Sequence, residues 1–401
     1  MEFWLYDDKS YDKLFPLSLS RPTGAFRLGI LTIAEKWEHE LKGTAVFLTR
    51  SPIAEKYNSQ NSSTASLYIN GRLAPNAAVL SAIEALPEES VLMAGEETLA
   101  AKTTTLGVFP WEDDKLSSLS RVDYSGDVHI INQLPDIFTF NGEAIEADFE
   151  RLTKGRESAD LLSHNILLGE RSKLFIEPGA TVNASILNTQ NGSIYIGKDA
   201  EVMEGSKIRG PFALCDHSST KLDTKIYGPT TVGPHSKVGG ELNNVVIFGY
   251  SNKGHDGFLG NSVLGEWCNI GADTNNSNLK NNYTEVKLWN YKRKGFAKTG
   301  LQFCGLIMGD HSKCGINTMF NTGTVVGFSS NIFGSGFPRN FVPDFSWGGA
   351  SGFNTYLPKK AIEVAKIVMS RRKIEFTADD EAVFNHIFEQ NKADRVWEAT
   401  T

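Results

Sequence analysis

The fold is decided by residues 196–278, a stretch that begins IGKDAEVMEGSKIRGPFALCDHSST. Apolar residues return there at every sixth position, which is neither the period of a helix nor that of a flat strand. All members of the first series except Thr220 are large aliphatic residues: Ile196, Val202, Ile208, Leu214, Thr220, Ile226, Val232 and Val238. Glycine follows several of these positions, as Gly197, Gly233 and Gly239 show.

Two further series continue this period along the chain. The second starts after a slip of two residues and comprises Val246, Asn252, Phe258, Leu264, Ile270 and Asn276. The third follows an interruption and comprises Met308, Cys314, Phe320, Val326 and Ile332. Such a repeat is typical of a parallel β-helix, in which each short strand places one aliphatic side chain inward and three strands make a triangular coil. An ordinary β-sandwich is the alternative, but its strands would alternate with period two between turns.

The overall composition describes an ordinary soluble protein. With 401 residues, the chain has room for two or three domains. A net charge of −7 excludes an overall basic field for nucleic acid. The four cysteines share no CxxC spacing, which argues against a disulfide framework or a zinc site and suggests a reducing compartment. The start MEFWLYDDKS is unlike a signal peptide, and no apolar run approaches membrane-spanning length, so the cytoplasm is the expected location.

The first 150 residues alternate strand-like and helix-like segments. The strand-like segments are FWLYD, TAVFL, ASLYI and SVLMAG, and helices are expected around residues 30–41 and 78–86. This alternation favours an α/β layer with a mainly parallel sheet. Neither GxGxxG nor GxxxxGK follows the first strand, so the usual glycine-rich phosphate loops are missing. Residues 136–156 are expected to form a charged helix that joins this domain to the coils.

An insert rich in asparagine, lysine and aromatic residues interrupts the repeat at residues 275–303. A β-helix usually ejects such an insert as a loop from one corner, where it can reach a neighbour or close on a ligand. Two readings of its basic residues remain open, namely phosphate contacts and a solvated basic loop. These basic residues are Lys287, Lys292, Arg293, Lys294 and Lys298.

The C-terminal tail carries two helical patterns, at residues 359–372 and 379–391. Val364, Ile367 and Val368 would form an apolar stripe against the last coil, so the tail is interpreted as a cap on the open end of the β-helix. The predicted domains are an α/β domain at 1–150, a β-helix at 151–350 with the inserted loop 275–303, and a helical tail at 351–401.

Three histidines are predicted to share one column of the coil. His217 and His235 lie one coil apart, and each of His217, His235 and His255 stands three places after a hexad position. Three readings compete for the column: a general base toward an amine or hydroxyl, a metal site shared between subunits, and corner histidines that bond to the backbone. The structural reading is favoured for His217 and His235, whereas the residues around His255 favour catalysis.

The residues around His255 carry a resemblance to a known family. The run SNKGHDGFLGNSVLGEWCNIGADTNNSN, residues 251–278, resembles the acetyltransferase signature of the bifunctional glucosamine-1-phosphate N-acetyltransferase / N-acetylglucosamine-1-phosphate uridyltransferase family. The positions that match in order and nearly in spacing are Lys253, His255, Gly260, Asn269, Gly271, Ala272 and Asn278. The resemblance implies a left-handed β-helix, a homotrimer, and acetyl-CoA and a hexosamine 1-phosphate as substrates.

The resemblance also implies roles for individual residues. His255 would be the base that deprotonates the sugar 2-amino group. The substrate would be bound by Lys225, Glu241, Lys253, Phe258 and Asn269, and acetyl-CoA by Gly271, Ala272 and Asn278. The chain departs from the family pattern at Phe258, where the family has tyrosine, and at Asn243, where it has a second basic residue. An ammonium group becomes a nucleophile only after losing a proton, whereas a thioester mainly needs positioning, so a single base suffices.

The N-terminal half is similar to sugar nucleotidyltransferases, but more weakly. The similarity lies in FPLSLSRPTGAFRLGILTIAEKW, residues 15–37, and implies that Arg21, Arg27 and Lys36 contact a nucleotide, UTP or another NTP. Asp7 and Asp8 stand where glycines would cradle the triphosphate, and they would repel phosphate unless Mg²⁺ intervened. No residue is assigned as a metal ligand.

The leading hypothesis is therefore a two-domain enzyme of amino-sugar nucleotide synthesis, with acetyl transfer in the β-helix and nucleotidyl transfer in the first domain. It would act on small molecules and would bind neither nucleic acid nor membrane. One alternative keeps a single activity, either acyl transfer or nucleotidyl transfer. Another is a non-catalytic trimeric scaffold that binds a nucleotide sugar.

Overall fold

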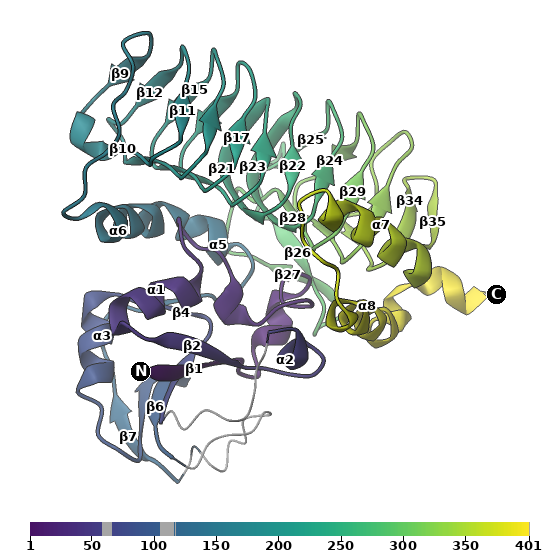
Figure 1. Ribbon diagram of the computed structural model, residues 1–401. Helices are drawn as coiled ribbons and strands as arrows, with labels where there is room; N and C mark the ends of the chain where they lie inside the picture. The colour runs from purple at the N-terminus through teal and green to yellow at the C-terminus, as the bar shows by residue number, and fades with distance from the viewer. Residues whose placement is uncertain (58–65, 105–115, 117, 401) are drawn as a thin grey trace.

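The computed structural model describes residues 1–57, 66–104, 116 and 118–400. A small α/β domain lies beside a long stack of coils, and the C-terminal helices pack along the far part of that stack (Figure 1). The predicted fold class, an α/β domain followed by a left-handed parallel β-helix and C-terminal helices, is confirmed. None of the helices in these ranges combines the length and the apolar character that crossing a bilayer requires.

The α/β domain is built on a six-stranded sheet in the order β2-β1-β3-β6-β5-β7. Its strands are β1 (Glu2–Tyr6), β2 (Thr44–Leu48), β3 (Leu67–Asn70), β5 (Ser90–Ala94), β6 (Glu97–Lys102) and β7 (Ser120–Asp123). The pairs β1–β2, β1–β3 and β5–β7 are parallel, and β6 is antiparallel to both its neighbours, so the sheet is mainly parallel as predicted. A separate two-stranded ladder joins β4 (Leu73–Ala74) to β8 (His129–Ile130).

The helices of this domain begin where the sequence provides caps. Helix α1 (Ile33–Leu41) starts with a capping box in which the Thr32 side chain accepts from the Glu35 amide and Glu35 accepts from the Thr32 amide. The Asn76 side chain caps α3 (Ala77–Glu84). The shorter elements are α2 (Ile53–Lys56), α5 (Asp136–Thr139), η1 (Tyr11–Leu14) and η2 (Thr23–Ala25). Helix α6 (Asn141–Thr153) follows α5 and leads to the coils.

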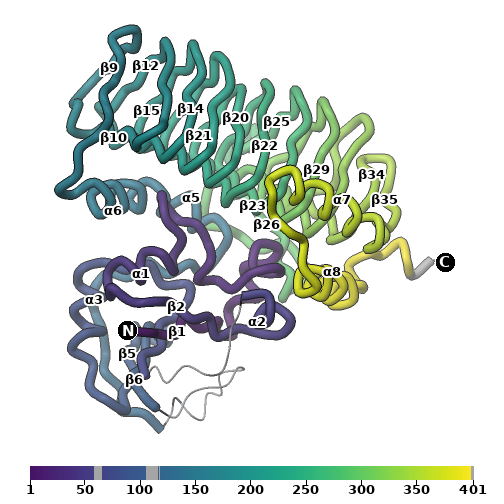
Figure 2. The backbone as a smooth tube through the Cα atoms, in the orientation of Figure 1, coloured from purple at the N-terminus to yellow at the C-terminus, as the bar shows by residue number. Residues whose placement is uncertain are grey.

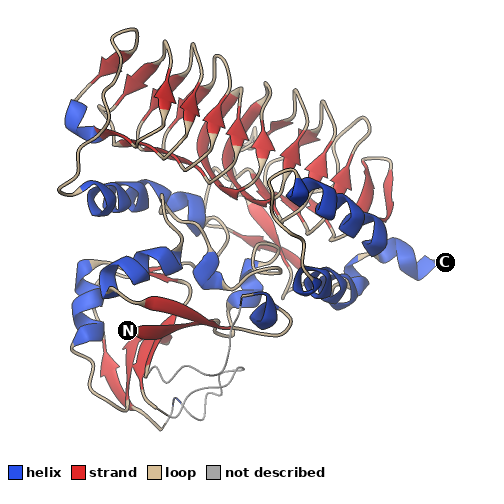
Figure 3. Ribbon diagram, viewed as in Figure 1, coloured by secondary structure: helices blue, strands red, loops and turns tan. Residues whose placement is uncertain are grey.

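The coils have three flat faces, each a ladder of short parallel strands, as Figures 2 and 3 show. Face 1 contains β10 (Leu174–Ile176), β13 (Ile194–Ile196), β16 (Phe212–Leu214), β19 (Thr230–Val232), the second halves of β21 (Glu241–Gly249) and β23 (Phe258–Glu266), β28 (Leu306–Met308), β31 (Thr324–Val326) and β33 (Phe341–Val342). Face 2 contains β11 (Thr181–Val182), β14 (Glu201–Val202), β17 (Ser219–Thr220), β20 (Lys237–Val238), β22 (Asn252–Lys253), β24 (Asn269–Ile270), β29 (Lys313–Cys314), β32 (Asn331–Ile332) and β34 (Ser346–Gly349).

Face 3 contains β9 (Ile166–Leu168), β12 (Ile186–Asn188), β15 (Lys207–Arg209), β18 (Lys225–Tyr227), the first halves of β21 and β23, β25 (Asn275–Asn276) and β30 (Met319–Phe320). The aliphatic residues of the predicted hexads fill the interior between the three faces. The last coil ends in an antiparallel pair of β34 with β35 (Gly352–Thr355).

The second hexad series is wrong in its first half. Val232 pairs with Ile247, so Ile247 points into the coil, and Val246 packs outward against the N-terminal domain. Leu242 and Ile247 both point inward. Leu242 follows Val238 by four residues and Ile247 follows Leu242 by five, whereas a regular hexad repeat would give six each time. The shortened corners shift the register by one, which brings Lys253 and Leu259 inward in place of Asn252 and Phe258. From Leu264 onward the predicted series points inward.

The predicted histidine column is also wrong for His255. His217 stacks on His235 with ring centroids 4.8 Å apart, but the stack continues through Tyr250, Trp267 and His311. All five residues have positive φ, between 52° and 61°, at the corner between faces 1 and 2. The register shift places His255 at the next corner, between β22 and β23.

Face 1 joins the two domains into one core. Its outward side chains, among them Phe248, Val263 and Ile307, belong to the same apolar cluster as Phe26 and Ile137 of the N-terminal domain. Helices α5 and α6 cover the earlier coils of this face. Face 1 is therefore a domain interface over most of its length, and faces 2 and 3 are free of the N-terminal domain.

The insert forms a hairpin of β26 (Lys287–Asn290) and β27 (Gly295–Lys298) and reaches the N-terminal domain. Tyr291 at its tip packs edge-on against Phe15, with ring centroids 5.7 Å apart. Lys292 forms an ion pair with Asp12 at 3.1 Å.

Helices α7 (Pro358–Ser370) and α8 (Ala378–Gln390) form the tail, which ends in η4 (Lys392–Asp394) and η5 (Val396–Thr400). The predicted stripe of Val364, Ile367 and Val368 is wrong for Ile367, which is 62% exposed, whereas Val364 and Val368 are half-buried. The buried residues of α7 are Ala361, Ile362, Ala365 and Met369. Helix α8 packs against α2, where Lys56 pairs with Asp380 at 3.3 Å.

Candidate functional site

The candidate site lies at the corner between faces 2 and 3 where His255 stands. The His255 side chain is exposed on the bend that follows β22 and precedes the first half of β23. Lys253 lies under this bend, and its Nζ donates to the carbonyl oxygens of His255 at 2.6 Å and Asp256 at 3.3 Å. The ammonium group thus fixes the backbone that presents the imidazole.

Lys253 itself occupies an interior position of the coil, paired with Val238, and is 2% exposed. Burial lowers its pKa from 10.5 to about 8, and Asp256 opposes this shift. The structure thus gives Lys253 backbone partners inside the corner and leaves little of it exposed to a substrate. It is a positioning residue for the corner.

The buried ammonium predicts a pH dependence of stability. Between pH 8 and 10.5 the unfolded chain holds a proton at Lys253 that the folded chain releases, so the unfolding free energy should rise with pH in that window. The rise should total roughly 3 kcal/mol and be absent in Lys253→Met. Urea unfolding of both proteins at several pH values measures the difference, and equal slopes would contradict the assignment.

Three of the predicted substrate residues form one outward row on face 3. Lys225 pairs with Glu241 and Glu241 with Phe258 in adjacent strands. The Lys225 ammonium lies 3.8 Å from the Glu241 carboxylate, and both side chains are substantially exposed. Phe258 follows His255 by three residues, so this row ends beside the His255 corner. The row therefore offers a cation, an anion and an aromatic ring on face 3, along the edge that begins at this corner.

Gly271 and Ala272 stand at the same corner one coil further on. The pairing of Asn252 with Asn269 aligns the two coils, and the Asp273 amide donates to the Asp256 carbonyl at 3.1 Å. A Cβ at Gly271 would lie 2.4 Å from the Gly315 carbonyl. Close packing between adjacent coils is therefore enough to explain why residue 271 is a glycine.

A matched pair of substitutions tests the reason for this glycine. Gly271→Ala should destabilise the protein by roughly 1–3 kcal/mol, because the methyl group would collide with the next coil. Gly254→Ala, the aligned position one coil earlier, should be nearly neutral, since nothing lies within 4 Å of its Cβ. Urea unfolding compares the two variants, and equal stabilities would show that the coils can adjust.

Asn269 and Asn278 lie away from the His255 corner. Asn269 is exposed on face 2, between Asn252 and Lys313. Asn278 lies past the opposite end of face 3, where its Nδ2 donates to Asn261 Oδ1 at 2.8 Å. Their predicted contacts with sugar and cofactor remain predictions.

The three predicted nucleotide contacts, Arg21, Arg27 and Lys36, are buried and bonded within the chain. Arg21 pairs with Asp310 and, at 3.3 Å, with Glu266 of the β-helix. Arg27 Nε donates to the Phe248 carbonyl at 2.9 Å, and Lys36 pairs with Asp148. These bonds favour a structural role at the domain interface, and a nucleotide role stays a prediction.

The place of the missing phosphate loop is filled by two ion pairs. Asp7 accepts from Thr23 N at 2.8 Å and pairs with Arg50 at 3.2 Å. Asp8 pairs with Arg72, which is fully buried and also bonds to Glu97 at 2.8 Å. The residues present therefore do not fit a Mg²⁺ ion at Asp7 and Asp8, since guanidinium groups already neutralise both carboxylates.

Metal ligands and cysteines add no further site in the described ranges. No group of three or more His, Cys, Asp or Glu side chains among these residues is arranged to hold a metal ion. The four cysteines are buried and free. Burial raises the pKa of the Cys215, Cys268 and Cys304 thiols to about 12, which makes them unreactive near neutral pH.

A second group of residues lines a cavity at the far end of the β-helix, and the sequence pointed only to Lys287 and Lys294 among them, as possible phosphate contacts. Lys287 and Lys294 of the insert line it, together with Arg339, Trp289 and residues from the tail. None of the residues predicted for the sugar, acetyl-CoA or nucleotide sites lines this cavity. The mixture of lysines and aromatic residues in the insert was the signal for it in the sequence.

Each comparison with known proteins covers only part of the chain. Residues 3–157 match the family model described as sugar nucleotidyl transferase. The bifunctional sugar-1-phosphate nucleotidylyltransferase/acetyltransferase of Sulfurisphaera tokodaii is 31% identical over 144 residues, which make up 35% of this chain and 35% of that protein. The match thus spans about a third of the length of this curated relative.

Three solved structures with similarity to the chain are transferases by title. The Francisella novicida UDP-N-acetylglucosamine acyltransferase is 9% identical and covers 57% of this chain and 87% of its own, with a TM-score of 0.27. The polySia specific acetyltransferase NeuO is 12% identical, with coverages of 52% and 94% and a TM-score of 0.23. A hexapeptide transferase family protein from Anaplasma phagocytophilum is 14% identical, with coverages of 51% and 87% and a TM-score of 0.19. These TM-scores are low, and the coils described above establish the fold without them.

Proposed function

We propose that this chain is an enzyme of sugar-nucleotide synthesis whose β-helix transfers an acetyl group from acetyl-CoA to the amino group of a hexosamine 1-phosphate. The observation that carries the proposal is the exposed His255 imidazole, fixed by Lys253 beside the outward row of Lys225, Glu241 and Phe258. The family match and the name of the bifunctional relative support sugar 1-phosphate chemistry in general.

The proposed reaction needs one base and one electrophile. His255 accepts a proton from the sugar ammonium group, which frees its nitrogen lone pair. The nitrogen attacks the thioester carbonyl carbon, a C–N bond forms, and the C–S bond breaks. The thiolate leaves with the electron pair of that bond and takes up the proton from the imidazolium, and the nitrogen, now part of an amide, releases its second proton to solvent. The products are an N-acetylated sugar and the free thiol of coenzyme A.

The acceptor class follows from the charges on face 3. Lys225 lies opposite Lys207 in the preceding strand, and both lysines are exposed. Such a pair suits a sugar phosphate, and Glu241 suits hydroxyl or ammonium donors of the sugar. Glucosamine 1-phosphate is the favoured acceptor, because it carries both a phosphate and an amine.

For the N-terminal domain we propose nucleotidyl transfer from UTP or another NTP to the sugar phosphate, on the strength of the family match. A second candidate is nucleotide-sugar binding without turnover. The pairs Asp7–Arg50 and Asp8–Arg72 favour this second candidate, because they fill the place where a triphosphate and its metal would lie.

A homotrimer in the cytoplasm completes the proposal. Two large apolar side chains, Leu222 and Ile316, are 62% and 70% exposed at the same corner as His255, two coils before it and two coils after it. A second copy packed on this corner would cover them and would border the acetyl transfer site. The buried free cysteines agree with a reducing compartment.

One incubation tests both activities. The protein is mixed with acetyl-CoA, with several hexosamine 1-phosphates and with each NTP, and the products are identified by mass. We expect an acetylated sugar phosphate, and a nucleotide sugar if the first domain turns over. If neither forms with any combination, the scaffold reading replaces this proposal.

A further inference from the structure

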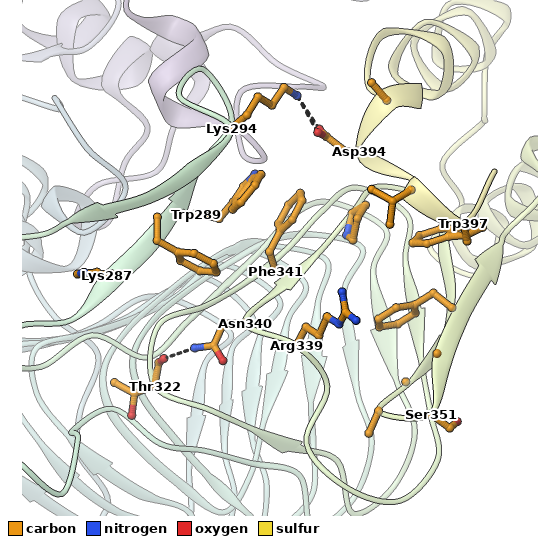
Figure 4. Close-up of a pocket in the computed structure, with 18 of the residues that line it drawn as sticks. Lys287, Trp289, Lys294, Thr322, Arg339, Asn340, Phe341, Ser351, Asp394 and Trp397 are labelled. Atoms are coloured by element: carbon orange, nitrogen blue, oxygen red, sulfur yellow. Dashed lines mark hydrogen bonds and ion pairs between the residues drawn. The ribbon is translucent and has the colours of Figure 1, made fainter. Parts of the chain in front are cut away.

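A large cavity lies between the insert, the last coils and the C-terminal tail. Its volume is about 1290 Å³, and its walls come from three parts of the chain that are distant in sequence. The hairpin of β26 and β27 forms one wall, the segments around β33 and the turn between β34 and β35 form the floor, and η4 and η5 form the other wall (Figure 4). The cavity is therefore built by a single chain.

The cavity is strongly cationic. Lys280, Lys287, Lys294 and Arg339 line it, and Asp394 is the only acidic residue among its lining residues. Both Asp394 oxygens bond to Lys294 Nζ at 2.8 Å, which leaves no excess negative charge. The side chains of Arg339 and Lys287 are exposed, and neither forms a hydrogen bond or ion pair with a described residue. Arg339 and Lys287 are both available to anionic groups, but they lie on opposite sides of the cavity (Figure 4).

Aromatic rings surround these cations. Trp289 stacks on Phe341 with centroids 4.2 Å apart and planes within 10°, and Phe353 lies 5.9 Å from Trp397. Figure 4 shows Arg339 between Phe341 and Trp397, with its guanidinium group directed into the cavity. Planar ring systems bind to such aromatic surfaces by stacking.

Two further details indicate a prepared site. Trp397 is held by a bond from its Nε1 to Thr355 Oγ1 at 2.9 Å, and the Lys294–Asp394 pair ties the tail to the hairpin. Trp289 Nε1 is buried without a partner among the described residues, although nearly all such groups in proteins are bonded.

We propose that the cavity binds a nucleoside diphosphate group, with its base among the aromatic residues and its phosphates at Arg339. This site is separate from the His255 corner, so it would be a second ligand site of the chain. The same chemical group occurs in a nucleotide sugar and at the nucleotide end of coenzyme A. Either molecule would supply both the ring and the paired phosphates that the cavity is suited to bind.

Calorimetric titration of the full-length protein with UDP, ADP and coenzyme A tests the proposal. We expect saturable binding of at least one, and about tenfold or more weaker binding to Arg339→Ala, since that variant loses a charge-assisted hydrogen bond. Preference for UDP would indicate a nucleotide sugar, and preference for coenzyme A an acyl carrier. Arg121→Ala is the matched control, because Arg121 is exposed in the other domain and pairs with Asp123.

Three results would overturn the proposal. The first is that none of the three compounds binds. The second is that Arg339→Ala binds these compounds as tightly as the unchanged protein does. The third is that inorganic pyrophosphate binds as tightly as UDP, which would show that the rings do not contribute. Binding should persist in His255→Ala, so this site and the proposed acetyl transfer can fail independently.

Discussion

A His255→Ala variant should transfer acetyl groups roughly 10²–10⁴ times more slowly than the unchanged protein, because a positioned general base contributes about that factor. The sugar amine would still bind, but its proton would have to pass to water. The rate is measured as thiol release from acetyl-CoA with glucosamine 1-phosphate as acceptor. Thermal stability should be unchanged, since the His255 side chain is exposed and its backbone carbonyl still accepts from Lys253.

His217→Ala is the control for this variant. His217 is also an exposed histidine at a coil corner, but its ring stacks on His235 at the corner between faces 1 and 2. Its removal should leave the acetyl transfer rate within about twofold, as expected for a residue outside the reacting centre. If His255→Ala kept the full rate, or if both variants lost it equally, His255 would not be the base.

The six-residue period was enough to predict the β-helix and most of its interior. An aliphatic residue that recurs at every sixth position must face one side of short strands in a coil, so residues from Ile196 to Val238 could be assigned directly. The register could not be carried past Gly239. The two corners after Val238 are shortened, and the local sequence gives no separate signal for the length of a corner.

This register error also explains the false histidine column. A shift of one residue changes which side chains face inward, and it moved Lys253 into the coil and Tyr250 into the aromatic stack. A lysine in an interior position contradicts the usual pattern of burial. Only the carbonyl groups of His255 and Asp256, which lie within its reach, make that position possible.

The roles of the buried charges in the N-terminal domain could not be predicted from the sequence. Arg21 and its partner Asp310 are 289 positions apart, and no local motif links them. A resemblance assigns such an arginine to a nucleotide, because it compares one segment with a family and ignores the rest of the chain. The partner becomes visible only when the β-helix is placed against the domain.

An Arg21→Met variant should lose about 3–5 kcal/mol of unfolding free energy, because removing one partner of a buried ion pair leaves the other charge buried and unpaired. The Arg21 side chain is 3% exposed, and so is that of Asp310. Without the guanidinium group, the Asp310 carboxylate would keep only the Ser20 hydroxyl and the Glu266 amide as donors. Urea unfolding followed by circular dichroism measures the loss.

Two variants separate this interface role from a general effect of losing a charge. Arg121→Ala removes an arginine whose pair with Asp123 is 49% and 73% exposed, and it should cost less than about 1 kcal/mol. Arg21→Met combined with Asp310→Asn should recover part of the stability, because no unpaired charge remains buried. Unchanged stability of Arg21→Met together with lost UTP binding would instead place Arg21 in a nucleotide site.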